Sequence, residues 1–260
     1  MYESILREMI KAVQESSLEI MRIYKNGFDI RIKSDESPVT DADIASDKII
    51  RNKLSVFNEI AWLSEEDADD LSRLNKRELF IIDPLDGTQD FCDRDGSFGI
   101  NVAYVIDHKP VVTVIGIPRD GVFAYAVKGQ GSFYVHEDGR EEQMHVSDRV
   151  KDLIMVGSRT HELPEERAVY QKHAVLIKET RCYGASLKAV YLAMGIVDAS
   201  IRYTKMTKEW DVCAPDLIVK EAGGIFCDTN LKEFNYNRAD VYNRDGYCMF
   251  NRKENTVLLK

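Results

Sequence analysis

The sequence contains few of the features that mark exported, membrane-bound or nucleic-acid-binding proteins. It has only five widely spaced cysteines and no C-x-x-C motif. This pattern predicts free thiols in a reducing compartment, so we expect a cytoplasmic protein. No apolar run approaches the roughly 18 residues that span a membrane, and we expect no membrane partner. Charged residues interrupt the N-terminal segment, which is not the pattern of a signal peptide.

Positive charge is also in deficit. The chain has 35 Lys and Arg residues against 44 Asp and Glu residues, which gives a formal net charge of −9. We therefore do not expect nonspecific binding of a nucleic-acid polymer. A small anionic substrate is compatible with this charge if metal ions, helix N-termini or a few placed basic residues lie at its binding site.

The 260 residues suffice for one large domain or two closely packed halves. Their patterning predicts helices over 2–26, 41–57, 164–174, 186–195 and 212–224 and strands over 60–63, 79–82, 153–158, 197–203 and 225–228. Short β-rich runs separated by turn residues fill 97–146, which is typical of an antiparallel meander. We expect a mixed α and β fold, with an N-terminal half at 1–150 and a C-terminal half at 151–260.

The most informative stretch is IIDPLDGTQDF, residues 81–91. A simple turn explains a proline between two aspartates. However, Asp83 ends an apolar run, and sheets of mixed α and β proteins usually bind ligands at strand ends. Pro84 restricts the backbone, so that Asp83 and Asp86 can converge on one point where a cation relieves their repulsion. Oxygen donors without histidine or cysteine indicate a hard cation such as Mg²⁺.

Two further acids stand beside predicted elements. Glu65 is the first acid after the strand 60–63 and is a possible oxygen ligand, although the spacing alone favours a solvated acidic loop for the run SEEDADD. Asp211 precedes a helix, where an aspartate also stabilises the helix N-terminus without any ligand. With Asp83 and Asp86, these residues have the composition of a hydrolytic site with two metal ions.

Such a site also needs a group that orients and deprotonates a water molecule. Thr88, with Asp43 from the segment PVTDAD, has the appropriate hydroxyl and carboxylate. A favourable interaction with the helix dipole is the alternative explanation for Asp43, because it lies in the first turn of the predicted helix 41–57.

Three segments, in the order WLSEED, IIDPLDGTQDF and EWDVCAPDLIVKEAGG, resemble the lithium-sensitive, Mg²⁺-dependent phosphatases of the inositol monophosphatase superfamily. The resemblance runs from KSDESPVTDAD to the end of the chain. KSDESPVTDAD, GSRTHE, GASLKAVYLAMGIVDASIR and WDVCAPD are most similar to the 3′(2′),5′-bisphosphate nucleotidases. Those enzymes remove the 3′-phosphate from 3′-phosphoadenosine 5′-phosphate, a by-product of sulfate assimilation and sulfonation.

The resemblance implies a layered αβαβα sandwich and two or three Mg²⁺ ions, with inhibition by Li⁺. The metal ligands that it implies are Glu65, Asp83, Asp86, Asp211 and the carbonyl group of Leu85. It further implies that Asp43 and Thr88 activate the attacking water. The amides of Gly87 and Thr88 would hold the scissile phosphate, and Asp211 would also contact the substrate.

The resemblance also indicates contacts to a nucleotide or its second phosphate. The residues concerned are His161, Gly184, Lys188 and Arg202. Three of them have a simpler explanation: His161 as a loop residue, Lys188 as an exposed helix residue, and Arg202 as a charge on an edge strand. The sequence departs from the nucleotidase pattern at Ala185-Ser186, where a double serine is usual, and this departure concerns the substrate.

Other functions share parts of this pattern. An inositol monophosphatase would use the same metal site, and an inositol polyphosphate 1-phosphatase would use Lys188 and Arg202 as well. The aspartyl-phosphate phosphatases have a D-x-D-G-T motif, but Asp86 lies three positions after Asp83 rather than two, and we reject that mechanism. A non-catalytic scaffold protein would lack ligands, whereas every ligand position is filled. The sequence leaves monomer and homodimer open.

Overall fold

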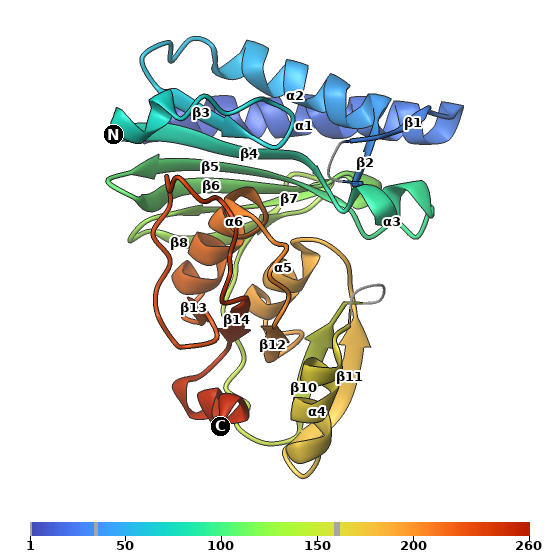
Figure 1. Ribbon diagram of the computed structural model, residues 1–260, viewed down its shortest axis with the longest axis vertical. Coiled ribbons are helices and arrows are strands. Elements are labelled where there is room, and N and C mark those ends of the chain that lie inside the picture. The colour runs from blue at the N-terminus through green and yellow to red at the C-terminus, as the bar shows by residue number, and fades with distance from the viewer. Residues whose placement is uncertain (1, 34–35, 159–161) are drawn as a thin grey trace.

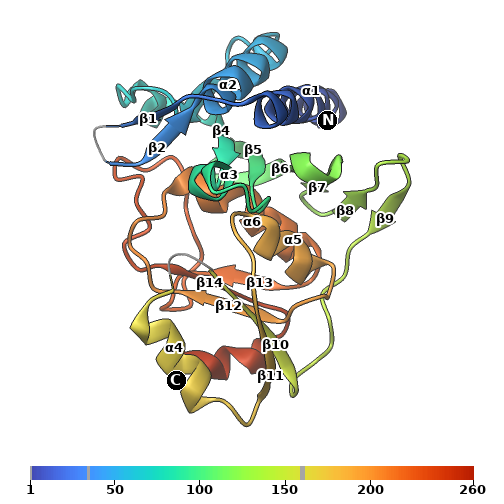
Figure 2. The ribbon, with the colours of Figure 1, turned by 90° about the vertical axis from the view of Figure 1, so that its right-hand side faces the viewer.

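Helices and sheets alternate in five layers in the computed structural model (Figures 1 and 2). The structure describes residues 2–33, 36–158 and 162–260, so His161 lies outside the described residues. From top to bottom in Figure 1 the layers are a helix pair, a large sheet, a second helix pair, a smaller sheet and a final helical layer. This arrangement confirms the αβαβα sandwich. No helix within the described ranges is both long and apolar enough to cross a membrane.

The outer helical layer covers one face of the large sheet. Helix α1 (Glu3–Asn26) buries Met9, Val13 and Ile20 at helical spacing. Helix α2 (Asp41–Leu54) is capped by Thr40, whose hydroxyl accepts the Ala42 N–H at 3.1 Å, and it ends three residues before the predicted position 57. A short hairpin of β1 (Ile30–Ile32) and β2 (Pro38–Thr40), which the sequence did not predict, connects the two helices.

The large sheet has seven strands in the order β3-β4-β5-β6-β7-β8-β9. Their bounds are β3 Ala61–Ser64, β4 Glu78–Asp86, β5 Gly99–Ile106, β6 Lys109–Ile117, β7 Val122–Val127, β8 Gly131–Val135 and β9 Glu141–Gln143. Strands β5 to β9 form the antiparallel meander predicted over 97–146. Strand β4, predicted over 79–82, pairs antiparallel with β5, and β3 pairs with β4 in parallel. The 3₁₀ helices η1 (Ser72–Asn75) and η2 (Pro118–Asp120) precede β4 and β7.

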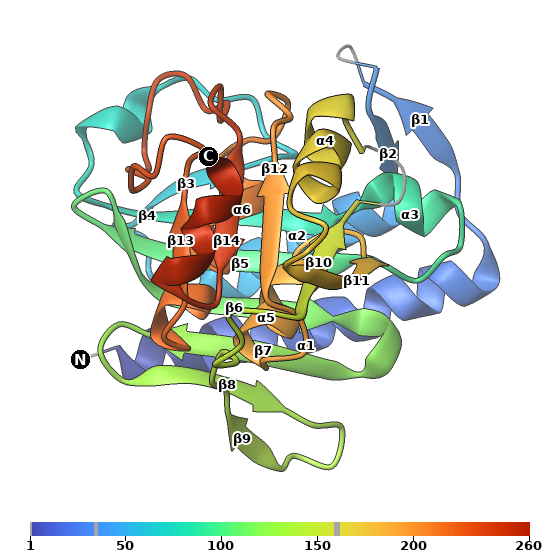
Figure 3. The ribbon, with the colours of Figure 1, turned by 90° about the horizontal axis from the view of Figure 1, so that it is seen from below.

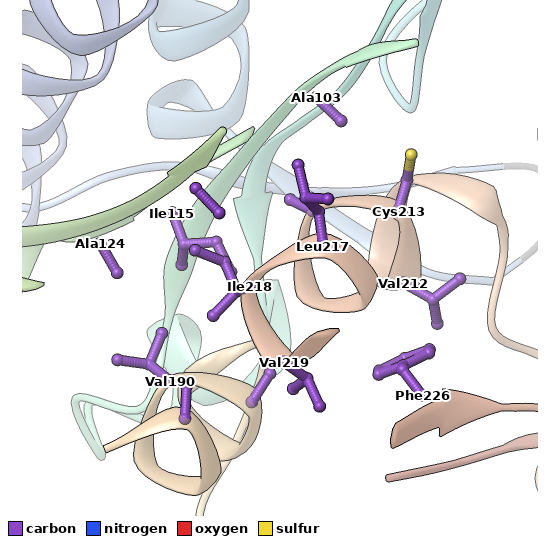
Figure 4. Close-up of a cluster of buried hydrophobic side chains, with 14 of the residues drawn as sticks. Ala103, Ile115, Ala124, Val190, Val212, Cys213, Leu217, Ile218, Val219 and Phe226 are labelled. Carbon is purple, nitrogen blue, oxygen red and sulfur yellow. The ribbon is translucent and has the colours of Figure 1, made fainter. Parts of the chain in front are cut away.

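Helices α5 (Leu187–Ala193) and α6 (Glu209–Glu221) lie between the two sheets. Figure 4 shows Leu217 and Ile218 of α6 pointing toward Ala103 and Ile115 of the large sheet. Burying apolar residues on both sides of α6 joins the two sheets into one core. Helix α6, from the second half, packs directly on β5 and β6 of the first half. The proposed division at residue 150 stays a prediction.

The smaller sheet has the strand order β11-β10-β12-β14-β13. Its strands are β10 Leu153–Gly157, β11 Ile177–Cys182, β12 Ala199–Arg202, β13 Ile225–Cys227 and β14 Tyr247–Phe250. Helix α4 (Pro164–Lys172) lies beside β10 and β11, and the C-terminal 3₁₀ helix η3 (Lys253–Leu259) lies beside β13 and β14 (Figure 3). Strand β12 is central, so Arg202 does not carry a charge on an edge strand.

Candidate active site

A bulge in β4 brings Asp83 and Asp86 to the same side of the large sheet. Asp83 pairs with Asn101 of β5 and Asp86 with Gly99, so three steps on β4 face two on β5. Side chains alternate along a strand, and three steps would normally place the carboxylates on opposite faces. The extra residue corrects this. Pro84 lies in the bulge, where its missing N–H breaks no ladder hydrogen bond.

Glu65, Asp83 and Asp211 form a compact carboxylate cluster. One oxygen from each lies within 4.8 Å of the others. Glu65 directly follows β3, and its N–H donates to the Ile82 carbonyl at 3.2 Å, which fixes it beside Asp83. Asp211 lies in the first turn of α6, where its Oδ2 accepts the Lys208 N–H at 2.6 Å. The helix begins at Glu209, not at the predicted residue 212, so Asp211 belongs to it.

Burial makes this cluster unfavourable without a cation. It raises the pKa of Asp83 and of Asp211 well above the ordinary value, and the neighbouring carboxylates raise both further. Burial also raises the pKa of Asp86, against the opposing effect of Lys188. A positive ion held by these oxygens would restore the charged forms. The donor set therefore fits a hard divalent cation.

Asp43 and Thr88 meet across α2 and α3 (Thr88–Cys92). Asp43 is 1% exposed, and its Oδ2 accepts two bonds from Thr40, one from the amide at 2.7 Å and one from the hydroxyl at 2.6 Å. Its Oδ1 lies 3.0 Å from the Thr88 hydroxyl, which also lies 3.1 Å from the Leu85 carbonyl oxygen. Asp43 thus serves both as the partner of Thr40 in the helix cap and as the partner of Thr88. Burial raises its pKa, although these bonds oppose the shift.

Two glycines of the candidate site occupy positions where a side chain does not fit. Gly87 has φ 88°, and a Cβ there would lie 3.0 Å from the Ser97 carbonyl oxygen. A Cβ on Gly184 would lie 2.2 Å from Asp90 Oδ2 and 2.6 Å from the Ser97 carbonyl oxygen. Close packing against α3 and the following loop therefore requires glycine at 184. A direct contact of Gly184 with substrate stays a prediction.

A cavity of about 660 Å³ opens between the two sheets beside the carboxylate cluster. Asp86, Gly87 and Asp211 line it, and so do Lys188 and Arg202. The side chains of Phe226 and Tyr247 are also part of the lining, and their rings stack with centroids 5.6 Å apart and planes 7° apart. The cavity therefore combines acidic, basic and aromatic surface.

Lys188 is not the exposed helix lysine that its sequence position allows. It is 5% exposed, and its ammonium donates to the Ala185 carbonyl at 2.8 Å and to the Tyr183 carbonyl at 3.3 Å. Burial, reinforced by the nearby charge of Arg202, lowers its pKa to about 8. Arg202 is 4% exposed and pairs with Glu166. The structure thus brings both predicted cations to one cavity.

Sequence reasoning missed several residues around the cluster. The Lys33 ammonium lies 2.6 Å from Glu66 Oε1 and 3.4 Å from Glu65 Oε1. Burial raises the pKa of Glu66 to about 7, against the effect of Lys33. Asn101 donates to Asp86 Oδ2 at 3.0 Å. Lys33 and Glu66 belong to the segments KSDESPVTDAD and WLSEED that the sequence analysis quoted, but neither was given a role there. The strand pairing that places Asn101 is indicated by no local sequence pattern.

Known proteins resemble this chain in sequence and in fold over almost their whole length. The family model for the inositol monophosphatase family matches residues 1–259. The chain is 32% identical over 256 residues to the 3′(2′),5′-bisphosphate nucleotidase CysQ of Aggregatibacter actinomycetemcomitans, covering 94% of this chain and 92% of the relative. It is 30% identical over 250 residues to the Salmonella typhimurium protein of the same name, covering 94% of this chain and 98% of the relative.

Solved structures of related proteins have the same fold as this chain. CysQ from Bacteroides thetaiotaomicron, described as a bacterial member of the inositol monophosphatase family, superposes with a TM-score of 0.82 at 27% identity, covering 97% of this chain and 99% of that one. The extragenic suppressor protein suhB of Bartonella henselae reaches a TM-score of 0.82 at 24% identity, covering 99% and 97%, and shows the shared fold. We conclude that the chain belongs to the inositol monophosphatase family and is a phosphomonoesterase.

Proposed function

We propose that the protein is a Mg²⁺-dependent 3′(2′),5′-bisphosphate nucleotidase that removes the 3′-phosphate from 3′-phosphoadenosine 5′-phosphate. The observation that carries this proposal is the pair of buried cations, Lys188 and Arg202, in the same cavity as Asp86 and Asp211. A second phosphate needs such cations when metal ions neutralise the first. The names of the bacterial relatives support the same substrate.

The carboxylates fit the metal requirement of this reaction. The clustered oxygens of Glu65, Asp83 and Asp211 would hold Mg²⁺. Asp86 and the Leu85 carbonyl oxygen are the further ligands that we propose. Bound there, the metal would supply Lewis acidity toward the phosphoryl oxygens and lower the pKa of a coordinated water. Oxygen donors alone suit Mg²⁺ better than zinc or copper.

Asp43 and Thr88 handle the proton of the attacking water in this proposal. When Thr88 donates its hydroxyl proton to Asp43 Oδ1, 3.0 Å away, its oxygen lone pairs become free to accept a proton from water. Asp43 is held for this task because Thr40 occupies its other oxygen. The amides of Gly87 and Thr88 are proposed to hold the scissile phosphate, since Gly87 lets the backbone approach closely.

The remaining part of the cavity suits the nucleoside. Tyr247, whose ring stacks on the buried Phe226, gives the cavity an aromatic side chain, and an adenine base has a flat face that can pack against it. An inositol ring is saturated and hydroxylated, so it gains less from such a wall. Lys188 and Arg202 would then meet the 5′-phosphate.

Phosphate release with Mg²⁺ tests the proposal. The substrates are 3′-phosphoadenosine 5′-phosphate, adenosine 3′-phosphate and inositol 1-phosphate at matched concentrations. We expect the highest kcat/KM for the bisphosphate, because only it has both the base and the second phosphate. Equal values for the two nucleotides would remove the role of the cations. A preference for the inositol ester would make the protein an inositol monophosphatase with the same metal site.

A further inference from the structure

Glu166 is a buried acid with no place in the reaction described above. It lies in the first turn of α4, and its side chain is fully buried. Its Oε2 accepts a hydrogen bond from the Arg202 guanidinium at 2.6 Å and another from the Leu163 amide at 3.3 Å. Its other oxygen accepts the Tyr203 N–H at 3.0 Å. The carboxylate therefore holds both the Arg202 side chain and the backbone that follows it.

This ion pair belongs to the buried wall of the cavity. The side chains of Arg202 and Glu166 are 5% and 0% exposed. Charges buried to this degree are stable only when they are paired, because each alone has a large desolvation penalty. Arginine also has a flexible aliphatic stem, and a fixed carboxylate restricts the positions of its planar head. Glu166 thus determines where the Arg202 charge lies.

Arg202 does not act alone in the cavity. Its charge is one cause of the lowered pKa of Lys188, which places the two cations within electrostatic range of each other. Two buried cations without a counterion would repel each other and separate. Glu166 neutralises Arg202, while the carboxylates of Asp86, Asp90 and Asp211 favour the charged form of Lys188, so both cations can remain beside the cavity. Both line the cavity that also contains Asp86 and Asp211.

We infer that Glu166 is a positioning residue for substrate selectivity: by holding Arg202 at the cavity wall, it sets the preference for an ester that carries a second phosphate. This inference rests on the proposed function. Glu166 acts through Arg202 and not on the substrate. Its loss therefore affects recognition of the second phosphate, while hydrolysis at the first continues.

The test compares Glu166→Gln with wild type on two nucleotides, 3′-phosphoadenosine 5′-phosphate and adenosine 3′-phosphate, with Mg²⁺. Glutamine keeps an acceptor for the Tyr203 amide but removes the charge. We expect KM for the bisphosphate to rise about tenfold, while KM for the monophosphate and both kcat values change less than twofold. Glu165→Gln, an exposed acid in the same helical turn, is the matched control and should leave all values unchanged.

A double-mutant cycle separates positioning from a general structural effect. In an Arg202→Gln background, Glu166→Gln should raise KM for the bisphosphate no further, because its target is gone. Equal losses on both substrates, or additive effects in the cycle, would overturn the inference. Glu166→Asp keeps the charge and should retain most of the selectivity, which provides a second variant if glutamine lowers the melting temperature strongly.

The outcome for wild type distinguishes this inference from the proposed function. A wild-type enzyme that does not prefer the bisphosphate would overturn both. A wild-type preference that persists in Glu166→Gln would overturn the role of Glu166 and leave the nucleotidase proposal intact.

Discussion

Replacing Asp43 with asparagine should abolish most activity with little loss of stability. Asp43 Oδ2 accepts two hydrogen bonds from Thr40, and Oδ1 faces the Thr88 hydroxyl at 3.0 Å. An asparagine has only one oxygen, and the two Thr40 donors will orient it toward Thr40. Its NH₂ group then faces Thr88 and must donate to the hydroxyl oxygen. The Thr88 proton turns to the Leu85 carbonyl oxygen, 3.1 Å away.

The size of the effect follows from this reversal. The variant has no acceptor for the proton of an attacking water, and general base catalysis contributes roughly 10²–10⁴ in rate. We therefore expect kcat to fall by a factor in that range, or about 3–5 kcal/mol in activation free energy. Stability should change by only about 1 kcal/mol, the value of a helix cap, because the bonds from Thr40 persist.

The assay is Mg²⁺-dependent phosphate release at saturating substrate, beside thermal unfolding of the same preparation. Asp41→Asn is the control, because Asp41 lies in the same helical turn but pairs with Arg31 outside the cluster. A loss of less than tenfold in the Asp43 variant would refute the assignment of Asp43 and Thr88 to the water. A large fall in melting temperature would show that the capping role dominates.

Three other predictions concern the metal and the cations. Asp86→Asn should remove most turnover while the melting temperature stays close to wild type, because asparagine keeps an oxygen for the Asn101 and Ser186 donors but removes one charge from the site. Retained Mg²⁺-dependent turnover would contradict the ligand role. The lowered pKa of Lys188, about 8, means that its positive charge is lost as pH rises through 8, so KM for the bisphosphate should rise between pH 7 and 9 while KM for adenosine 3′-phosphate stays constant. The free energy of unfolding should increase from pH 8 to 10.5, since only the unfolded chain still binds that proton. Chelation of the metal should lower the melting temperature. Mg²⁺ at 100 times its Kd should then raise the free energy of unfolding by about 2.7 kcal/mol. Li⁺ should inhibit phosphate release, and absence of both metal effects would contradict the site.

Asp83 and Glu65 could be identified from sequence as candidate metal ligands because each stands at a local boundary. Asp83 and Glu65 end apolar runs, and such ends are visible without a structure. The start of the helix 41–57 was predicted correctly, because the capping chemistry that marks a helix start is also local. The position of Asp86 depends on the β4 bulge, which only the pairing with β5 defines.

Other elements could not be predicted because their sequence is not periodic. Strand β11 reads IKETRC and is mostly exposed, so it lacks the alternation that identifies a strand. The helix 212–224 was predicted, but with Pro215 in its first turn; α6 begins at Glu209, so Pro215 lies inside it, and burial of the surrounding residues between the sheets overrides the preference of proline for helix ends. The contact of Glu166 with Arg202 joins residues 36 positions apart, and no local pattern marks it.

The two sheets contribute different residues to the candidate active site. Glu65, Asp83 and Asp86 belong to the ends of β3 and β4 in the large sheet. The cations and aromatic residues that face the rest of the cavity come from α5 and the smaller sheet. We therefore expect substitutions in the smaller sheet to change which ester fits without altering the proposed hydrolytic groups. Such a scaffold can acquire new substrates during evolution while keeping one chemistry, with Asp211 of α6 as the link between the two parts.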